Sequence, residues 1–449
     1  MGFVGAAMAA AVAAARNETG APIFDVVGLD LPTQQGSQRI KAINAGCFPF
    51  ETTDPDLKSV TSCAVSTGNL RASDDPSEYE TADIVIVDIH LDVDFEAKPP
   101  TAKFAGFKGA IATLAERVRP GVLVIVETTV PPGTTEYIVA PLIREALGRR
   151  SVASESVLIA HSYERVMPGS QYLKSITDIW RVYSGVTEAA GRACEMFLQR
   201  IVNTKKFPLT RLKRPLESET AKLLENSFRA VNIAFIEEWA RFAEQSGIDL
   251  GAIISAIRMR PTHRNIMRPG FGVGGYCLTK DPLLLGVGAR DILGLGDLTF
   301  PFCETAVHTN QKMPLATLEM LKKHLGGLAK KRILLFGASY REDVSDTRYS
   351  PSADFLFWAE EGGAIVHVHD PLVDMLEDYA VHRGDANPEG YDAVVFAVAH
   401  HAYRVLEPAV WLAGSKPLVI DANMVLSPHQ IEAFRKAGCN LKVIGRGDL

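Results

Sequence analysis

The sequence predicts an α/β protein with two doubly wound parallel-sheet domains, joined by a long central helix and a helical middle domain. Short β-branched runs alternate with helical patterns in the first half of the chain and again near its end, which is typical of parallel sheets covered by helices on both faces. Between these regions about thirty residues run without Pro or Gly, which predicts one long helix. A chain of 449 residues is also too long for a single core.

The first alternating region has the pattern of a Rossmann-like sheet. Its expected strands are short runs rich in Val and Ile that end at turn residues. Helical patterns over 105–118 and 134–147 separate the later strands. The four expected strands are Phe24 to Asp30, Asp83 to Asp88, Gly121 to Glu127 and Val157 to His161.

The middle and end of the chain complete the predicted architecture. The long helix is expected from Glu217 to Gly247, and a rise of about 1.5 Å per residue gives it a length of roughly 45 Å. Such a rod joins domains or pairs with a second copy of itself. The pattern predicts three domains, 1–210, 211–321 and 322–449, with the second Rossmann-like sheet in the last. The expected strands of that sheet are Arg332 to Phe336, Ala364 to His369, Ala393 to Val398 and Pro417 to Asp421.

The composition argues against several classes of protein. A formal net charge of -6 with no basic stretch argues against a nucleic-acid binder. The 6 cysteines are scattered without a CxxC pair, which favours reduced thiols in a cytoplasmic enzyme over a disulfide framework. The apolar opening, Gly2 to Ala15, lacks the basic start of a signal peptide. No other run approaches the about 20 apolar residues that cross a bilayer, so no membrane partner is expected.

The opening residues fit part of a dinucleotide-binding turn. Gly2 and Gly5, with Phe3 and Val4 between them, can serve as the second and third glycines of a G-x-G-x-x-G turn, which places backbone N–H groups and a helix N-terminus against a pyrophosphate. Asp30, at the end of the first expected strand, would then bind the adenosine ribose hydroxyls. An acid there favours NAD over NADP because it repels a 2′-phosphate. The alternative is an alanine-rich helix that only packs on a sheet.

Two features of this turn are unusual. The first glycine of the pattern and the strand that normally precedes it are absent, although that strand is central in such a sheet. We therefore expect that Met1 is an internal methionine and that the natural chain begins upstream, which mass spectrometry of the native N-terminus can test. The spacing from Gly2 to Asp30 exceeds the usual about 20 residues, which we assign to an insertion at 17–22.

The segment RPGFGVGGYCLTKD, from Arg268 to Asp281, is the first candidate for covalent chemistry. Glycines such as Gly274 and Gly275 let the backbone come close to a ligand. A nearby cation such as Lys280 lowers the pKa of a thiol, so a reactive thiolate is plausible at Cys277. A lone cysteine is more often an inert small hydrophobe, so this interpretation depends on partners elsewhere in the chain.

Other segments offer such partners. Thr129, in ETTVPPGTT, and Glu164, in HSYERVMPG, each follow an expected strand, where the ligand-facing residues of α/β sheets lie, and Glu164 suits general acid–base work. Lys222 and Asn226 are four residues apart and share a helix face, where they can stabilise a developing alkoxide. The alternatives are a Pro-Gly turn with a capping Thr, a surface Glu–Arg turn and a solvated helix face.

Two further features lie in the last third of the chain. Arg341 and Arg348, in FGASYREDVSDTRYSP, can clamp phosphates because the guanidinium fork suits anionic oxygens; a charged surface loop is the alternative. Histidines pair at 367 with 369 and at 400 with 401, but no matching ligand set accompanies them. We expect them to be structural and expect no metal.

Taken together and in this order, these segments resemble the UDP-glucose/GDP-mannose dehydrogenase family. The resemblance runs from Gly2 to about Asp421. Single motifs could arise by chance, whereas several in the right order and spacing are very specific. The matching segments are the Rossmann start, ETTVPPGTT, ERVMPG, the helix Lys222 to Asn232, GFGVGGYCLTKD and SYREDVSDTRYSP.

The resemblance implies a four-electron oxidation of a nucleotide sugar with NAD as cofactor. The C6 alcohol gives a hydride to NAD+ while Lys222 and Asn226 polarise its oxygen. Cys277 attacks the resulting aldehyde, a second hydride transfer leaves a thioester, and water held by Thr129 and activated by Glu164 hydrolyses it. Covalent attachment retains the reactive aldehyde between the two oxidations.

The resemblance also assigns the remaining residues. Asp281 assists proton movements near the thiol, Arg348 grips the substrate, and Arg264 reaches across a homodimer or higher homo-oligomer built on the long helix. The residues implied for the cofactor are Gly2, Phe3, Val4, Gly5, Asp30, Thr129 and Arg341. Those implied for the substrate are Glu164, Arg165, Lys222, Asn226, Arg264, Gly274, Gly275 and Arg348.

The choice of sugar depends on finer features. The strings ERVMPG (164–169) and GVGG (272–275) resemble the branch of the family that acts on UDP-N-acetylglucosamine or UDP-N-acetylmannosamine, whereas Lys280 beside Asp281 is more like the UDP-glucose branch. We expect a UDP-N-acetylhexosamine and a role in polysaccharide biosynthesis. UDP-glucose oxidation, a catalytically impaired nucleotide-sugar-binding homologue and a one-step dehydrogenase of the same superfamily are the alternatives. The sequence departs from the family pattern at Tyr163, Phe271 and 88–91 (DIHL).

Overall fold

The computed structural model describes residues 1–449 and divides the chain into two compact units. One comprises Met1–Glu225 with Leu283–Thr299, and the other comprises Asn226–Pro282 with Phe300–Leu449. We call them unit 1 and unit 2 and describe each by itself. The boundary between them falls within one continuous helix, α8 (Pro215–Ser246), which confirms the long helix expected from the sequence.

Unit 1 contains a five-stranded sheet in the order β3-β6-β7-β8-β9. Its strands are parallel except for the pair β7 and β8. A two-stranded parallel sheet, β1-β2, and an antiparallel ribbon, β4-β5, are separate from it. The four strands expected from the sequence are present as β1, β3, β6 and β7. The bounds are β1 Val26–Leu29, β2 Leu70–Ser73, β3 Ile84–Val87, β4 Val93–Asp94, β5 Thr101–Ala102, β6 Leu123–Val126, β7 Leu158–His161, β8 Val182–Gly185 and β9 Thr210–Arg211.

The helix α1 (Phe3–Ala13) packs against both sheets of unit 1. It is apolar on all sides, as is typical of a helix that is buried along most of its length. Ala10 and Ala11 belong to the core beside the five-stranded sheet, while Ala6 and Ala13 belong to the core beside β2. Because β1 and β3 share no hydrogen bonds, side-chain packing is what associates the two sheets.

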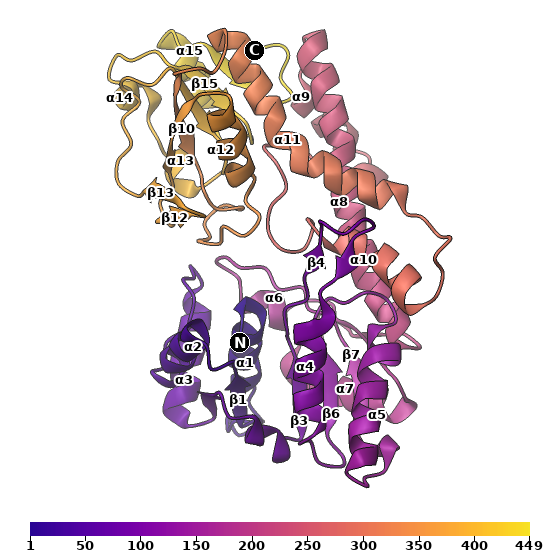
Figure 1. The fold of residues 1–449 in the computed structure, drawn as a ribbon. Helices are drawn as coiled ribbons and strands as arrows, with labels where there is room; N and C mark the ends of the chain where they lie inside the picture. Colours follow the sequence, from indigo (N-terminus) through magenta and orange to yellow (C-terminus); the bar gives the residue numbers. More distant parts are fainter. The chain divides into compact units, whose positions relative to one another are not determined.

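Helices cover both faces of the five-stranded sheet (Figure 1). Val124 and Val126 pack toward α4 and α5, whereas Leu123 and Ile125 pack toward α1 and α7. This alternation is the two-residue period of a strand buried on both sides. The other helices of unit 1 are α2 Gln34–Asn44, α3 Pro55–Thr67, α4 Phe104–Ala115, α5 Ala140–Arg149, α6 Lys174–Thr177 and α7 Glu188–Ile201.

Unit 2 contains a seven-stranded sheet in the order β12-β13-β11-β10-β14-β15-β16, parallel except for β12. The four strands expected from the sequence in this region are confirmed as β10, β11, β14 and β15. The bounds are β10 Arg332–Phe336, β11 Ile365–His369, β12 Met375–Leu376, β13 Tyr379–His382, β14 Ala393–Phe396, β15 Leu418–Asp421 and β16 Leu441–Val443.

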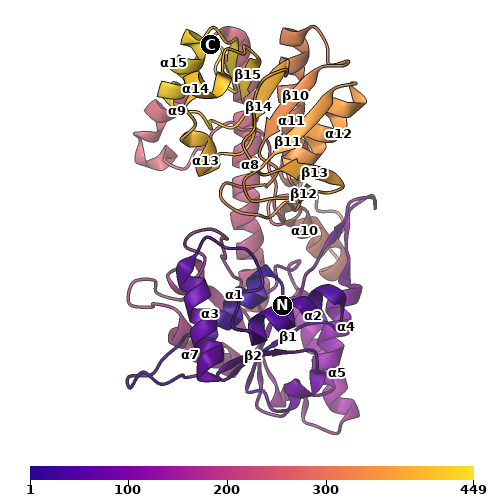
Figure 2. The ribbon, with the colours of Figure 1, turned by 90° about the vertical axis from the view of Figure 1, so that its left-hand side faces the viewer.

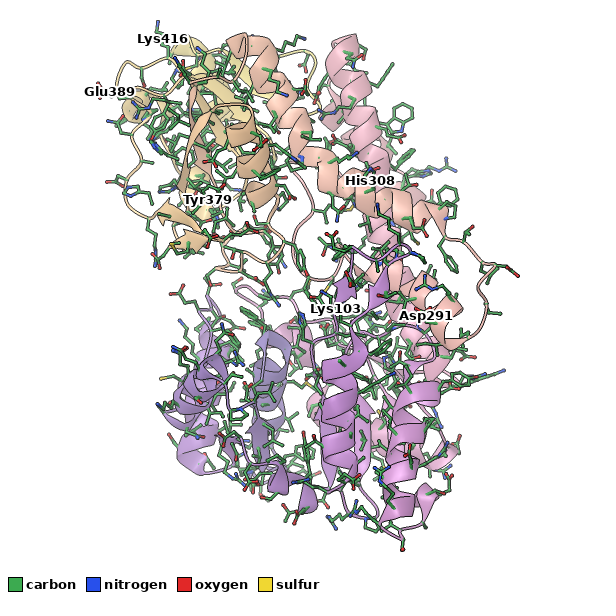
Figure 3. The ribbon with its side chains drawn as sticks, viewed as in Figure 1. Lys103, Asp291, His308, Tyr379, Glu389 and Lys416 are labelled. Atoms are coloured by element: carbon green, nitrogen blue, oxygen red, sulfur yellow. The ribbon has the colours of Figure 1, made fainter.

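The sheet of unit 2 is also covered on both faces, so it is doubly wound. Figure 2 shows α12 on one side of the sheet and α13 to α15 on the other. Tyr379, labelled in Figure 3, lies on β13 near the β12 edge, where its hydroxyl donates to Glu360 at 2.8 Å. The later helices of the chain are α9 Leu250–Arg258, α10 Asp281–Val287, α11 Pro301–Leu325, α12 Pro351–Glu361, α13 His401–Arg404, α14 Pro408–Leu412 and α15 Pro428–Lys436.

Two global properties bear on function. All cysteines are free thiols, which agrees with the scattered pattern in the sequence. None of the helices combines the length and the apolar character that a membrane span requires.

Candidate active site

Lys222 and Glu164 meet in unit 1. The Lys222 Nζ donates to the backbone oxygen of Glu164 at 2.8 Å and lies 3.6 Å from its carboxylate Oε1. Both side chains are buried. The Lys222 ammonium also lies 5.5 Å from the centre of the Tyr163 ring, so Tyr163, where the sequence departs from the family pattern, packs against this lysine. The structure therefore brings together two of the residues predicted from the sequence.

Two other predicted residues of unit 1 are Arg165, which follows Glu164 in the chain, and Thr129. Arg165 donates from Nη2 to Glu225 Oε2 at 2.8 Å and from Nη1 to the backbone oxygen of Trp180. Thr129 is half-buried and follows β6. Its neighbour Thr128 has a structural role instead, because its Oγ1 accepts from the Ile89 N–H at 2.8 Å and so ties the ends of β6 and β3 together.

A buried charge cluster in unit 1 was missed at the sequence level. Arg181 and Glu127 form a fully buried ion pair at the ends of β8 and β6. Burial raises the pKa of Asp88, and repulsion from Glu127 and Glu164 raises it further. Asp88 lies in the DIHL segment, so this departure from the family pattern places an acid close to Glu164. An arginine directly before a buried strand was the signal available in the sequence.

A neutral histidine adjoins the same cluster. His161 is fully buried at the end of β7, and its Nδ1 lies 2.6 Å from the Ser218 hydroxyl. Burial, together with the positive charges of Arg181 and Lys222, lowers the pKa of His161 to about 3. The imidazole therefore adds no charge to the site at neutral pH.

Glu219, also missed, holds the loop that follows Thr129. Its Oε1 accepts from the Thr135 N–H at 2.7 Å, and its Oε2 accepts from the Gly133 N–H at 2.6 Å. The carboxyl is 1% exposed, and burial raises its pKa to about 8. Glu219 stands one turn before Lys222 on α8, so it connects the loop after β6 to the helix that carries the lysine.

Unit 2 holds a second group of predicted residues. The Asn226 Nδ2 donates to Asp281 Oδ2 at 2.7 Å, and the Lys280 Nζ donates to Asp281 Oδ1 at 2.8 Å. Lys280 and Asp281 are each 1% exposed, so the carboxylate is held by partners on both oxygens. Lys280 also lies 4.4 Å from the centre of the Tyr276 ring. The sequence had suggested only a thiol-activating role for this lysine.

Cys277 is exposed at the end of the glycine loop, one turn before α10. Its backbone oxygen accepts from the Asp281 N–H at 2.9 Å, which fixes the loop to the helix that carries the aspartate. Gly275 adopts φ +78°, and a Cβ on Gly274 would lie 2.6 Å from the backbone oxygen of Tyr349. Both positions therefore require glycine, as expected for a loop that presents one side chain.

The arginines predicted to hold substrate differ in their surroundings. Arg348 forms a bidentate pair with Asp346, with contacts of 2.9 Å and 2.6 Å, and its backbone oxygen accepts from the Gly275 N–H at 3.0 Å. It therefore stands beside the glycine loop of Cys277. Arg341 is half-buried, with its Nε 3.8 Å from Glu342 Oε1, and Arg264 is exposed after a short 3-10 turn.

A cavity of about 430 Å³ opens beside the same loop of unit 2. Two arginines and glycine backbone line it together with apolar side chains. This combination suits a ligand with an anionic part, because guanidinium groups bind phosphate oxygens and the glycines expose backbone N–H groups. The lining residues are Ile233, Arg258, Met267, Arg268, Pro269, Gly270, Gly272, Val273, Met313, Asn423 and Met424.

Two features of the dinucleotide turn suit the binding of NAD. Gly2 is the N-cap of α1 without a side-chain cap, and a Cβ built on it would meet nothing within 4 Å, so a phosphate can approach the helix N-terminus. Asp30 follows β1 as predicted. Burial raises the pKa of its carboxyl, but Arg39, the Met1 ammonium at 3.1 Å and the Leu31 N–H together outweigh burial and lower that pKa to about 2. The carboxylate is therefore ionised, as a ribose ligand should be. Phe3, Val4 and Gly5 form the first turn of α1.

Comparisons with known proteins agree with this arrangement. Models of the UDP-glucose/GDP-mannose dehydrogenase family match residues 1–201 (NAD binding domain), 216–312 (central domain) and 334–428 (UDP binding domain). The UDP-N-acetyl-D-mannosamine dehydrogenase of Methanocaldococcus jannaschii is 30% identical over 432 residues, covering 94% of this chain and 92% of the relative. The NDP-N-acetyl-D-galactosaminuronic acid dehydrogenase of Ralstonia nicotianae is 27% identical and covers 91% of each chain.

The fold is shared with solved structures. The UDP-D-ManNAc dehydrogenase of Pyrococcus horikoshii superposes with a TM-score of 0.82 and 27% identity, over 100% of this chain and 98% of that one. The glycine turn, the thiol loop and the two doubly wound sheets thus fall within one sequence match that spans almost the whole chain. The chain belongs to the UDP-glucose/GDP-mannose dehydrogenase family and is an NAD-dependent nucleotide-sugar dehydrogenase.

Proposed function

We propose that this enzyme oxidises the C6 alcohol of a UDP-N-acetylhexosamine to a uronate through a thioester on Cys277. The observation that carries the proposal is the loop of unit 2 that exposes Cys277 while its backbone is fixed to Asp281. The relatives named for N-acetylmannosamine and N-acetylgalactosaminuronic acid support the choice of an N-acetylated sugar. The arginine-lined cavity beside the loop supports an anionic nucleotide portion.

The first oxidation needs a group that stabilises the alcohol oxygen as it loses its proton. NAD+, when bound, supplies a hydride acceptor for each of the two oxidations. The Lys222 ammonium donates to that oxygen, and so does Asn226, whose amide has two N–H groups and uses only one on Asp281. The alcohol thus loses a hydride from its carbon and the proton of its hydroxyl, which passes to the Asp281 carboxylate beside Asn226, and it becomes an aldehyde.

The second oxidation takes place on an intermediate that is bound covalently to Cys277. The Cys277 thiolate forms a C–S bond with the aldehyde carbon, and loss of a hydride from the adduct leaves a thioester. Water held by Thr129 then adds to the thioester carbon while Glu164 accepts its proton. The C–S bond breaks, the sulfur leaves as thiolate, and the carboxylate is released. Lys222, 3.6 Å from the Glu164 carboxylate, holds that carboxylate in place for this step.

The test is NADH release from the purified protein against a panel of UDP- and GDP-sugars. The proposal requires two NADH per molecule of UDP-N-acetylhexosamine and a uronate as product. One NADH per sugar would contradict the thioester route and favour a one-step dehydrogenase. Faster turnover of UDP-glucose than of every N-acetylated sugar would contradict the choice of substrate. Tight sugar binding with no NADH would favour an impaired homologue.

We further propose a cytoplasmic homodimer built on α8. This helix exposes large apolar side chains, which are 51% exposed at Phe228, 48% at Trp239 and 57% at Phe242. An apolar stripe of this kind on one helix is typical of a face that pairs with another chain. Arg264 would then reach the partner's substrate. Sedimentation of Trp239→Glu as a monomer at concentrations where the parent protein is a dimer would support this; a monomeric parent protein would contradict it.

The proposed functional domains keep the boundaries expected from the sequence. Residues 1–210 would bind NAD, 211–321 would carry the thiol and the dimer helix, and 322–449 would bind the UDP portion. The family matches for NAD and UDP binding domains support the outer two assignments.

A further inference from the structure

A buried histidine in unit 2 contacts the loop that carries the arginines. This loop, 337–350, follows β10. His400, which follows β14, is fully buried, and its Nδ1 accepts from the Asp343 N–H at 3.0 Å. The proton of a neutral imidazole must then be on Nε2, which lies 3.0 Å from Asp370 Oδ2 and 3.0 Å from Ser339 Oγ. We call these four residues the His400 cluster.

The His400 cluster fixes the loop at several points. The Ser339 hydroxyl donates to the backbone oxygen of Arg341 at 2.9 Å, and Asp370 Oδ2 accepts from the Ser339 N–H at 3.0 Å. Asp343 Oδ1 accepts from the His401 N–H at 3.0 Å. Asp343 has φ +55°, a conformation that a residue other than glycine keeps only when its surroundings hold it. The first half of the loop is therefore constrained by buried, mutually paired polar groups.

The second half of the loop contacts the glycine loop that carries Cys277. The Tyr340 N–H donates to the backbone oxygen of Asp346 at 3.0 Å, so the two halves are joined. The Tyr340 ring packs against Gly275, where a Cβ would lie 2.7 Å from Cε2. The Gly275 N–H donates to the backbone oxygen of Arg348 at 3.0 Å. Arg348 and the glycine two residues before Cys277 thus take their places from the same loop.

We propose that His400 is a positioning residue that sets Arg348 and the thiol loop for nucleotide-sugar binding through the segment 339–343. This inference rests on the proposed roles of Arg348 and Cys277. The cluster joins the carboxyl ends of β10, β11 and β14, the edge at which open α/β sheets bind ligands. Cys277 is also held by Asp281 from α10. Loss of His400 should therefore weaken binding more than it slows the chemistry.

The experiment compares His400→Ala, His400→Gln and Ser339→Ala in the full-length protein. The matched control is His367→Ala, since His367 is an exposed histidine of the same sheet whose Nδ1 lies 2.7 Å from the Tyr391 hydroxyl. UDP affinity is measured by calorimetry, and KM and kcat are measured with the nucleotide sugar. We expect His400→Ala to weaken UDP binding about tenfold and to raise KM similarly, with kcat within about threefold, because a buried hydrogen-bond network is lost.

His400→Gln distinguishes the hydrogen bonds of His400 from the space that its side chain fills. Glutamine can accept from the Asp343 N–H and donate to Asp370, so His400→Gln should recover most of the affinity. Ser339→Ala removes one hydroxyl from the core and should weaken UDP binding about fivefold. If His400→Ala does not fold, the UDP affinity of Ser339→Ala tests the proposal instead. His367→Ala should bind UDP as the parent protein does.

Three results would overturn the proposal. They are parent-like UDP affinity in folded His400→Ala or Ser339→Ala, a loss that His400→Gln does not relieve, and a fall in kcat with KM unchanged. UDP binding requires no oxidation, so it reports on the His400 cluster even if the proposed thioester route is wrong. An absence of NADH from the parent protein would contradict that route alone.

Discussion

Lys222 and Glu164 are joined twice, once through the backbone oxygen of Glu164 at 2.8 Å and once through its carboxylate at 3.6 Å. The lysine predicted to stabilise the alkoxide therefore also fixes the segment that carries the proposed general base. Each residue depends on the other for its position, so single substitutions at the two sites should not be additive.

Lys222→Ala should lower kcat by about 10²- to 10⁴-fold, because both the positive charge at the substrate oxygen and the anchor of Glu164 are lost. Stopped-flow measurement of the first NADH released checks this. Lys213→Ala, at an exposed site just before α8, is the control and should retain activity. A Lys222→Ala variant with a normal first oxidation would contradict the role of the lysine.

Cys277→Ser should block completion of the oxidation and leave binding of the sugar intact, because a serine hydroxyl is a far weaker nucleophile than a thiolate. The measurement is uronate formed per sugar, together with calorimetry for the sugar. Cys303→Ser, a half-buried cysteine on α11, is the matched control and should form uronate normally. Normal acid production by Cys277→Ser would rule out the thioester.

Glu164→Gln should slow hydrolysis of the thioester by about 10²- to 10⁴-fold, since the water loses its proton acceptor. The acyl-enzyme should then accumulate, and mass spectrometry of the digested protein should find the sugar on the Cys277 peptide after one turnover. Glu225→Gln, which removes the charged partner of Arg165, should accumulate no adduct. If Glu164→Gln turns over without an adduct, another residue activates the water.

The raised pKa of Glu219 predicts how the free energy of unfolding depends on pH. Burial raises its pKa from 4.5 to about 8, so the folded protein binds this proton more tightly than the unfolded chain does. The contribution to stability is present below pH 4.5 and is lost as the pH rises through about 8, at no more than about 1.4 kcal/mol per pH unit.

Urea unfolding of the parent protein and of Glu219→Gln at pH 6 and pH 9 tests this linkage. Between pH 6 and pH 9 the free energy of unfolding should fall more for the parent protein than for Glu219→Gln. This comparison of changes does not depend on how much the substitution itself destabilises the protein. Equal changes in both proteins would show that Glu219 does not take up a proton on folding.

The sequence was sufficient for features that depend on local patterns. The β-branched runs at 121–127 and 393–398 predicted strands β6 and β14, and the lack of Pro and Gly predicted α8. The four-residue spacing of Lys222 and Asn226 placed them correctly on one helix. These features need only neighbouring residues, so no knowledge of tertiary contacts was required.

The partners of the site residues could not be found in the same way. Arg181 pairs with Glu127 at a separation of 54 residues, and Glu219 reaches Thr135 across 84. Charged residues at such separations look like surface residues until the fold buries them together. The His400 cluster could not be predicted for the same reason. No metal-ligand spacing surrounds the paired histidines, and Ser339, which contacts His400, lies 61 residues away in the sequence.

The continuous α8 has one more consequence. Lys222 belongs to unit 1 and Asn226 to unit 2, yet no loop intervenes. Helix geometry alone therefore sets about 6 Å of axial rise between the two donors, at about 1.5 Å per residue. This spacing can change only if the turn of α8 between the two residues unwinds. A helix-breaking Leu224→Pro variant should for this reason uncouple the two donors while each unit keeps its own core.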